Sequence, residues 1–97
     1  MLINLKNENF NEEISNGKVL VDFYADWCGP CKMLSPNIDE ISNLIKVIKV
    51  NVDLHEDLSR EYGVMSIPCL VLLEDKKEIK RNIGYLSVDD LKNFINQ

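Results

Sequence analysis

The sequence has no excess of basic residues and no long hydrophobic run, and each absence excludes a class of function. Lysine and arginine number 11 against 16 aspartate and glutamate residues, which gives a net charge of −5. Nucleic acid and anionic membrane surfaces are therefore not expected partners, because phosphate groups bind to a basic face. No apolar stretch is long enough to span a bilayer. The opening residues, MLINLKNENF, lack the pattern of a secretory signal, so we expect a cytoplasmic protein.

Cysteine is also scarce, with three residues among 97. An odd number suits a disulfide scaffold poorly, and thiols in the cytoplasm are mostly reduced. A chain of this length fits one domain and can form one hydrophobic core without a metal or a disulfide. We therefore expect a single domain over residues 1–97. A monomer is expected because no large apolar patch can be argued from the sequence, and no metal or bound organic cofactor is implied.

Hydrophobic patterning predicts alternating strands and helices. Strands are predicted at 2–5, 18–25, 45–53, 68–74 and 78–84, and helices at 9–16, 28–44, 53–63 and after Ser87. Asn9, Asp53 and Ser87 each precede an acidic residue by three positions, the spacing of a capping box. Strand–helix–strand units imply parallel pairing, and the last two strands form an antiparallel hairpin. The expected fold is α/β, with three α/β/α layers around a mixed sheet.

Two of the cysteines lie in ADWCGPCK, where a predicted buried strand gives way to a helix. A helix N-terminus presents free N–H groups and a positive dipole end, and both favour a thiolate at Cys28. Pro30 suits the first turn of a helix, and Gly29 allows another backbone to approach. Cys31 lies one turn further in and is expected to be less exposed. We therefore expect Cys28 to attack a disulfide and Cys31 to resolve the mixed disulfide.

A zinc site or a purely structural disulfide would also use two close cysteines. A closed zinc site needs four ligands. Cys69 and His55 are the remaining candidates, and their spacings match no zinc motif that we recognise. A structural disulfide is not expected in a reducing compartment. The redox interpretation is favoured, because a Cys-x-x-Cys pair at a strand-to-helix junction is typical of redox chemistry.

One carboxyl group, Asp22, interrupts the apolar segment VLVDFYA. A carboxyl group buried in a sheet is costly to ionise, so its pKa would be raised. Such a group can act as a general acid or base near neutral pH. The alternative is that Asp22 faces solvent on an edge strand, and the residues alone leave both possibilities open.

The segments WCGPCK, SIPCL and NIGYL together resemble the thioredoxin family, and the resemblance extends over essentially the whole chain. It implies a cis peptide before Pro68, with that proline against the active disulfide. The backbone around Ile67 would then bind an extended segment of the partner. Gly84 would complete a shallow apolar groove with Ile67 and Ile83 nearby, and Trp27 would form a lip beside the exposed sulfur.

The resemblance also implies a proton-transfer group and a function. Asp22 would lie beneath Cys31 and exchange its proton, with Lys49 as a neighbour of that carboxyl group. The protein would be a general protein-disulfide reductase that passes electrons from a thioredoxin reductase to disulfides of target proteins. Two alternatives are a disulfide oxidant or isomerase on the same scaffold, and a non-redox binding subunit. Gly29 and Pro30 favour the reductase, and replacing Cys28 by serine would separate a redox role from a binding role.

Three positions depart from the family pattern. Cys69 follows the proline where threonine is usual, and it is either a small buried hydrophobic residue, which we favour, or a regulatory thiol that can be oxidised. Tyr24 stands where many relatives have a second tryptophan. The hairpin connection EDKKE lacks the usual glycine, so a looser turn is expected there.

Overall fold

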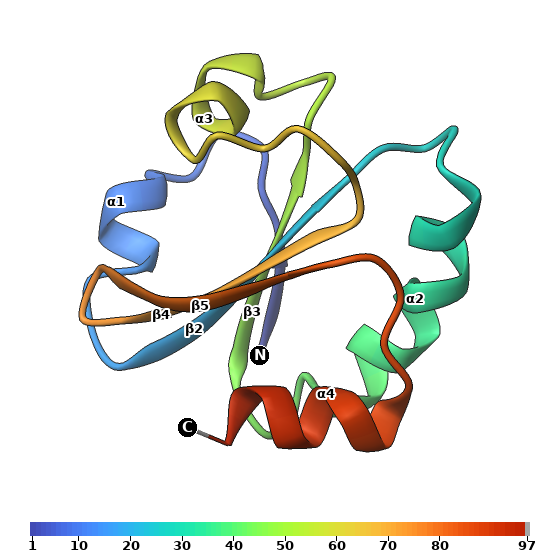
Figure 1. Cartoon of the computed structure of the whole chain (residues 1–97). Coiled ribbons are helices and arrows are strands. Elements are labelled where there is room, and N and C mark those ends of the chain that lie inside the picture. The colour runs from blue at the N-terminus through green and yellow to red at the C-terminus, as the bar shows by residue number, and fades with distance from the viewer. Residues whose placement is uncertain (97) are drawn as a thin grey trace.

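The chain forms a five-stranded sheet with helices on both faces (Figure 1), in a computed structural model that describes residues 1–96. The strands are β1 (Leu2–Asn4), β2 (Lys18–Tyr24), β3 (Lys46–Asn51), β4 (Cys69–Glu74) and β5 (Lys77–Ile83). The helices are α1 (Phe10–Glu13), α2 (Gly29–Ile41), α3 (Glu56–Glu61) and α4 (Val88–Ile95). Within residues 1–96, no helix has the length and apolar character needed to cross a membrane.

The sheet is mixed, as the sequence predicts. Its strand order is β1-β3-β2-β4-β5. β3 pairs in parallel with β1 and β2, whereas β4 pairs antiparallel with β2 and β5. β2 therefore lies at the centre of the sheet, and its carboxyl end leads directly into the loop that carries the cysteine pair.

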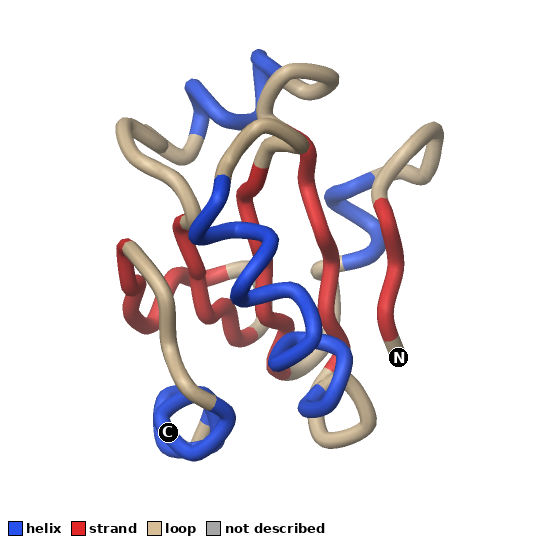
Figure 2. Tube along the Cα trace, turned by 90° about the vertical axis from the view of Figure 1, so that its right-hand side faces the viewer, coloured by secondary structure: helices blue, strands red, loops and turns tan. Residues whose placement is uncertain are grey.

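Alternating side chains of β2 point into two separate cores. Val21 and Phe23 belong to a cluster that also includes Phe10 of α1 and Leu58 of α3. Leu20 belongs to the other cluster, which contains buried residues of α2 and α4: Leu34, Ile38, Ile41, Leu91 and Ile95. Figure 2 looks onto the face that α2 covers. The three predicted layers are confirmed, with α1 and α3 on one face and α2 and α4 on the other.

Several predicted boundaries differ from the observed ones. α1 ends at Glu13 and α2 at Ile41, about three residues earlier than expected. The predicted cap of α3 at Asp53 is wrong, because α3 begins at Glu56 with His55 as its N-cap and no side-chain cap bond. His55 Nε2 instead donates to the carbonyl oxygen of Leu5, at 2.9 Å. The carboxylate of Asp53 instead accepts a hydrogen bond from the indole of Trp27.

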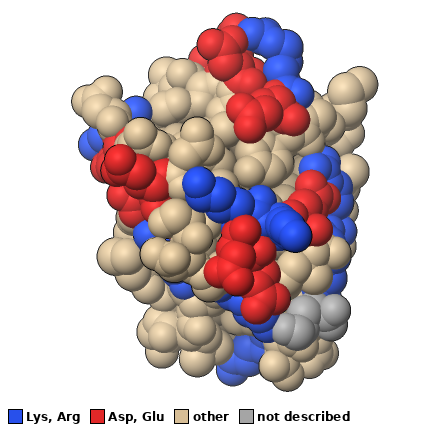
Figure 3. All heavy atoms as spheres, turned by 90° about the vertical axis from the view of Figure 1, so that its left-hand side faces the viewer, with Lys and Arg blue, Asp and Glu red and all other residues tan. Residues whose placement is uncertain are grey.

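The turn between β4 and β5 is held by two hydrogen bonds to Gly17, whereas the sequence predicted a looser turn. Asp75 and Lys76 connect the strands, and both have positive φ, at 49° and 74°. The N–H of Asp75 donates to the carbonyl oxygen of Gly17 at 3.0 Å, and the N–H of Gly17 donates to Asp75 Oδ1 at 2.8 Å. Acidic and basic side chains are interleaved on the face of the molecule that carries α1 and this turn (Figure 3).

Candidate active site

The cysteine pair lies at the N-terminus of α2, directly after the central strand. Cys28 is the N-cap residue, and its Sγ accepts a hydrogen bond from the N–H of Cys31 at 3.2 Å. Gly29 and Pro30 form the first turn, where a missing N–H costs nothing. Cys28 and Cys31 form a disulfide, with their Cα atoms 5.2 Å apart. The pair can therefore cycle between a dithiol and a disulfide at a helix end that favours negative charge on Cys28.

The expected difference in exposure between the two cysteines is wrong for this disulfide form. Cys28 is 4 % exposed and Cys31 is 6 % exposed. The two cysteines form a small apolar cluster with Ala25, and Val52 and Ile67 pack against it. The neighbouring loops therefore cover Cys28 about as well as the helix covers Cys31.

The loop before β4 brings the predicted docking residues to the cysteines. The Ile67–Pro68 peptide bond is cis, as the family resemblance implies. Ile67 packs against the cysteine cluster, and the carbonyl oxygen of Pro68 accepts a hydrogen bond from the N–H of Gly84 at 2.8 Å. Gly84 has a φ of 105°, which favours glycine, and Ile83 beside it is 60 % exposed. These four residues form one edge of the site.

Trp27 and Ile67 line one shallow pocket of the site, and Trp27 has a hydrogen-bond partner that the sequence did not indicate. Its indole is 69 % exposed, and Nε1 donates to Asp53 Oδ2 at 2.8 Å. A shallow pocket of about 160 Å³ lies beside Trp27, and its lining includes Val52, Met65 and Ile67. The position of Asp53 just after β3 was a usable signal, because the loops that follow the parallel strands β2 and β3 lie at the same edge of the sheet.

Asp22 is a buried carboxyl group beneath the helix that carries Cys31. It is 2 % exposed, and its Oδ1 has no hydrogen-bond partner among residues 1–96. The strand alternation places it on the same face as Leu20, toward α2. Burial raises the pKa of Asp22 from 3.8 to about 6, and the Lys49 charge partly opposes this rise. The edge-strand alternative is excluded, because β2 is the central strand.

Lys49 is the register partner of Asp22 on β3, and its ammonium group lies in a cavity next to Cys31. Nζ donates to Ser35 Oγ at 3.0 Å and lies 4.8 Å from the centroid of the Tyr24 ring. The cavity has a volume of about 390 Å³ and is lined by Tyr24, Ala25, Asp26, Cys31, Lys32, Ser35 and Lys49. Ser35 was not predicted, although its spacing of four residues from Cys31 puts both on one side of α2.

Cys69 lies on the opposite face of the sheet from Asp22. It pairs in register with Phe23 and belongs to the core beneath α1 and α3. The residue is 1 % exposed and carries a free thiol. Burial raises the pKa of this thiol, and the nearby Arg81 charge partly opposes the rise. These features match the interpretation of Cys69 as a small buried hydrophobic residue.

The loop after β5 is bound to α2 by one side chain that the sequence analysis did not single out. Asn37 Nδ2 donates to the hydroxyl group of Tyr85 at 3.0 Å and to the carbonyl oxygen of Leu86 at 3.1 Å. Tyr85 directly follows Gly84 and is 47 % exposed. One amide group therefore connects the helix of the cysteines to the segment that holds Gly84.

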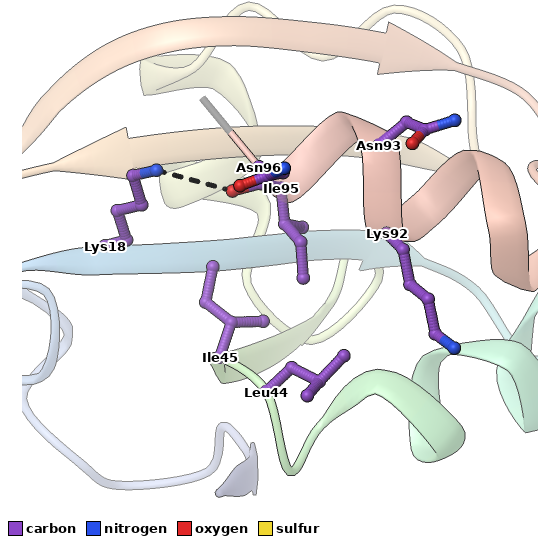
Figure 4. Close-up of a pocket in the computed structure, with 7 residues that line it drawn as sticks. All are labelled: Lys18, Leu44, Ile45, Lys92, Asn93, Ile95 and Asn96. Atoms are coloured by element: carbon purple, nitrogen blue, oxygen red, sulfur yellow. Dashed lines mark hydrogen bonds between the residues drawn. The ribbon is translucent and has the colours of Figure 1, made fainter.

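A larger pocket, of about 510 Å³, lies away from the cysteine pair. Figure 4 shows its lining side chains, from the start of β2, the segment before β3 and the end of α4. Lys18 Nζ lies 3.5 Å from the carbonyl oxygen of Ile95 there. Because Lys18 begins β2 and Cys28 follows its end, this pocket is separate from the site.

Comparison with known proteins identifies the family. A family model described as Thioredoxin matches residues 1–97. The thioredoxin of Chlamydia caviae is 48 % identical over 94 residues, which cover 93 % of this chain and 91 % of the relative. The thioredoxin of Bacillus subtilis is 35 % identical over 100 residues, which cover 99 % and 96 %. A solved structure of a mutant thioredoxin from Halobacterium salinarum matches with a TM-score of 0.87 at 37 % identity, over 98 % of this chain and 86 % of that one. The chain therefore belongs to the thioredoxin family, and it is a protein-disulfide oxidoreductase whose cysteine pair cycles between a dithiol and a disulfide.

Proposed function

We propose that the chain is a general protein-disulfide reductase in which Cys28 is the nucleophile and Cys31 the resolving cysteine. The Cys28 thiolate attacks one sulfur of a target disulfide, and the other target sulfur leaves as a thiolate. The Cys31 thiolate then attacks Cys28 Sγ, the bond to the target sulfur breaks, and the second target thiolate leaves. Two electrons pass to the target, and the Cys28–Cys31 disulfide forms. The observation that carries this proposal is the disulfide between the N-cap residue of α2 and the residue one turn further on.

The proposed docking surface consists of Trp27, Ile67, Pro68, Ile83 and Gly84, with Gly29 and Pro30 beside the sulfur. An extended target segment would add to the backbone at Ile67, where hydrogen bonds do not depend on the target's side chains. The cis bond at Pro68 and the short contact between Gly84 and Pro68 support this surface. Because the groove is shallow, binding is expected to be weak and transient.

We assign proton transfer at Cys31 to Asp22, with Lys49 tuning its acidity. The ionised carboxylate takes the thiol proton of Cys31, directly or through a water molecule, before Cys31 attacks. The burial of Asp22, its unpaired Oδ1 and its raised pKa support this role, because a carboxyl group with a pKa of about 6 can exchange protons near neutral pH.

The partners follow from the family. Members of the thioredoxin family generally exchange electrons with a thioredoxin reductase and with disulfides of target proteins. We propose that this chain does so in the cytoplasm, as a monomer with one domain over residues 1–97. The net charge of −5 makes nucleic acid and anionic membranes poor partners. No metal or bound cofactor is needed, because the two sulfurs carry the electrons.

The reduction potential of the cysteine pair tests the direction of electron flow. It is measured by equilibrating a Cys69→Ser variant, which has no other thiol, with a defined thiol–disulfide buffer. A potential well below that of the glutathione pool is expected for a reductase, and one well above it would favour the oxidant or isomerase alternative. A Cys31→Ser variant is expected to accumulate the mixed disulfide with its target, whereas Cys28→Ser forms none. A binding subunit would keep its partner after the Cys28→Ser change.

A further inference from the structure

Ser35 connects the cavity next to Cys31 with the lysine beside Asp22. Cys31 and Ser35 are one helical turn apart on α2, and both line this cavity of about 390 Å³. Ser35 Oγ accepts a hydrogen bond from Lys49 Nζ at 3.0 Å. On its other side the ammonium group lies over the Tyr24 ring, 4.8 Å from the centroid. A hydroxyl group and an aromatic face thus hold one cation at this position.

Lys49 is the charged group that acts on the pKa of Asp22. The other groups on the elements around Asp22 are as follows. Lys49 is its register partner on β3, and the apolar residue Leu70 is its partner on β4. Asp22 lies on the face of the sheet that α2 covers, and Cys31 is in the first turn of that helix. The titratable groups that line the cavity are Tyr24, Asp26, Cys31, Lys32 and Lys49. Cys69, another titratable group, starts β4 on the opposite face of the sheet.

The contact with Ser35 matters because a lysine side chain is long and flexible. Without a partner at the end of its stem, an ammonium group favours full hydration in solvent. Its attraction for a carboxylate falls with distance and with solvent screening. Among residues 1–96, Lys49 forms no ion pair, so the Ser35 hydroxyl group and the Tyr24 ring are what restrain its position.

We propose that Ser35 is a positioning residue for proton transfer at Cys31: its hydroxyl group holds the Lys49 ammonium group in the cavity and so keeps this charge beside the Asp22 carboxyl group. The inference rests on the roles proposed above for Asp22 and Lys49. A nearby cation favours the ionised carboxylate, which is the form that accepts the Cys31 proton. Ser35 itself neither gains nor loses a proton.

Loss of the Ser35 hydroxyl group would release Lys49 toward solvent. The pKa of Asp22 would then rise further, and less carboxylate would be present below that pKa. The proton of Cys31 would leave more slowly, and the attack on Cys28 Sγ in the mixed disulfide would slow with it. We expect the rate constant of this resolving step to fall about twofold below the Asp22 pKa, which corresponds to an upward shift of about 0.3 in that pKa.

The test uses the full chain in four forms: wild type, Ser35→Ala, Lys49→Met and the double variant. Asp22 is titrated by ¹³C NMR in the reduced protein, and the pH profile of target reduction is recorded in parallel. Ser35→Ala is expected to raise the Asp22 pKa by no more than Lys49→Met does. In the Lys49→Met background, Ser35→Ala is expected to add nothing. Ser35→Thr, which keeps a hydroxyl group, should restore the wild-type pKa.

Ser15→Ala serves as the control, because the Ser15 hydroxyl group donates to the carbonyl oxygen of Glu12, away from the cavity. If Lys49→Met raises the Asp22 pKa and Ser35→Ala does not, the role of Ser35 is wrong and that of Lys49 stands. If neither variant shifts the pKa, the role of Lys49 fails as well. A Ser35→Ala shift that persists in the Lys49→Met background would also overturn the inference, because Ser35 would then act without the lysine.

Discussion

The indole of Trp27 donates a hydrogen bond to the carboxylate of Asp53, 26 residues further along the chain. The bond joins the loop before the cysteine pair to the loop after β3. It also fixes an aromatic ring that is 69 % exposed and would otherwise be free to rotate. The ring stays beside the pocket that Val52 and Ile67 line, so one edge of the site is preformed.

Replacing Asp53 by alanine is expected to weaken target binding. The lost hydrogen bond is worth about 1 kcal/mol, which predicts a rise of about fivefold in KM for a protein disulfide, with little change in kcat. Trp27 is the only tryptophan of the chain, so its fluorescence anisotropy reports the freed ring. Asp57→Ala, at an exposed site on α3, is the matched control. Unchanged anisotropy in Asp53→Ala would contradict the prediction.

Asp22 is expected to make stability depend on pH. Its pKa is raised from 3.8 to about 6 in the folded protein, so the folded state binds the proton more tightly than the unfolded state does. This contribution to stability is fully present below the unfolded pKa of 3.8 and is lost as the pH rises through about 6. Once Asp22 is ionised, the loss amounts to about 3 kcal/mol.

Asp22→Asn removes this titration. The variant is expected to gain stability relative to wild type as the pH rises from about 4 to about 7. Urea unfolding of the oxidised proteins at both pH values measures the difference. Asp26→Asn, which removes a neighbouring exposed carboxylate, controls for net charge. A stability difference between Asp22→Asn and wild type that does not change with pH would refute the assignment.

Cys69 is expected to resist oxidation in the folded protein. The thiol is 1 % exposed, and its burial raises its pKa, so the reactive thiolate is scarce. After mild peroxide treatment, mass spectrometry should find Cys28 paired with Cys31 and Cys69 unmodified. The same thiol should react readily in denaturant. An adduct on Cys69 in the folded chain would revive the regulatory interpretation.

The β4–β5 turn can be made more stable. Lys76 has a φ of 74°, a conformation that costs a non-glycine residue about 1–2 kcal/mol. Lys76→Gly removes this strain at some cost in chain entropy, and it is expected to stabilise the protein by about 0.5–1 kcal/mol in urea unfolding. Lys77→Gly, in the strand that follows, should destabilise it instead. If Lys76→Gly and Lys77→Gly changed the free energy of unfolding equally, the positive φ of Lys76 would not be a source of strain.

The sequence predicted the layers and failed at contacts between distant segments. Burial could be predicted wherever it shows in the local sequence pattern. β2 has a continuous apolar run, and α2 has apolar residues at helical spacing, Leu34, Ile38 and Ile41. Asp53 has the correct spacing for a capping box, but its carboxylate accepts a hydrogen bond from Trp27 and does not cap α3. The turn without glycine is held by Gly17, 58 residues away from Asp75. Such partners meet only in the folded chain.

The same limit applies to the site. The cysteine pair is evident in a short motif, and the cis bond at Pro68 is implied by the family resemblance. Asp22 can be singled out because a charged residue interrupts an apolar strand. Ser35 and Asn37 lie within a helix whose sequence gives no sign of their partners. Lys49 and Tyr85, which they bind, come from other elements. Their relationship requires the register of β3 and the path of the loop after β5.

The amide of Asn37 binds the segment after Gly84 to the same helix that begins with the cysteines. These bonds link the proposed nucleophile, at the start of α2, to the proposed docking surface at Gly84 through a single helix. If this link keeps the docking surface from reshaping around a folded target, the target has to present its disulfide in an extended segment. In that case the local unfolding free energy of each target would decide which disulfides are reduced. Two proteins with identical sequences around a disulfide would differ in reactivity if one holds that segment more firmly.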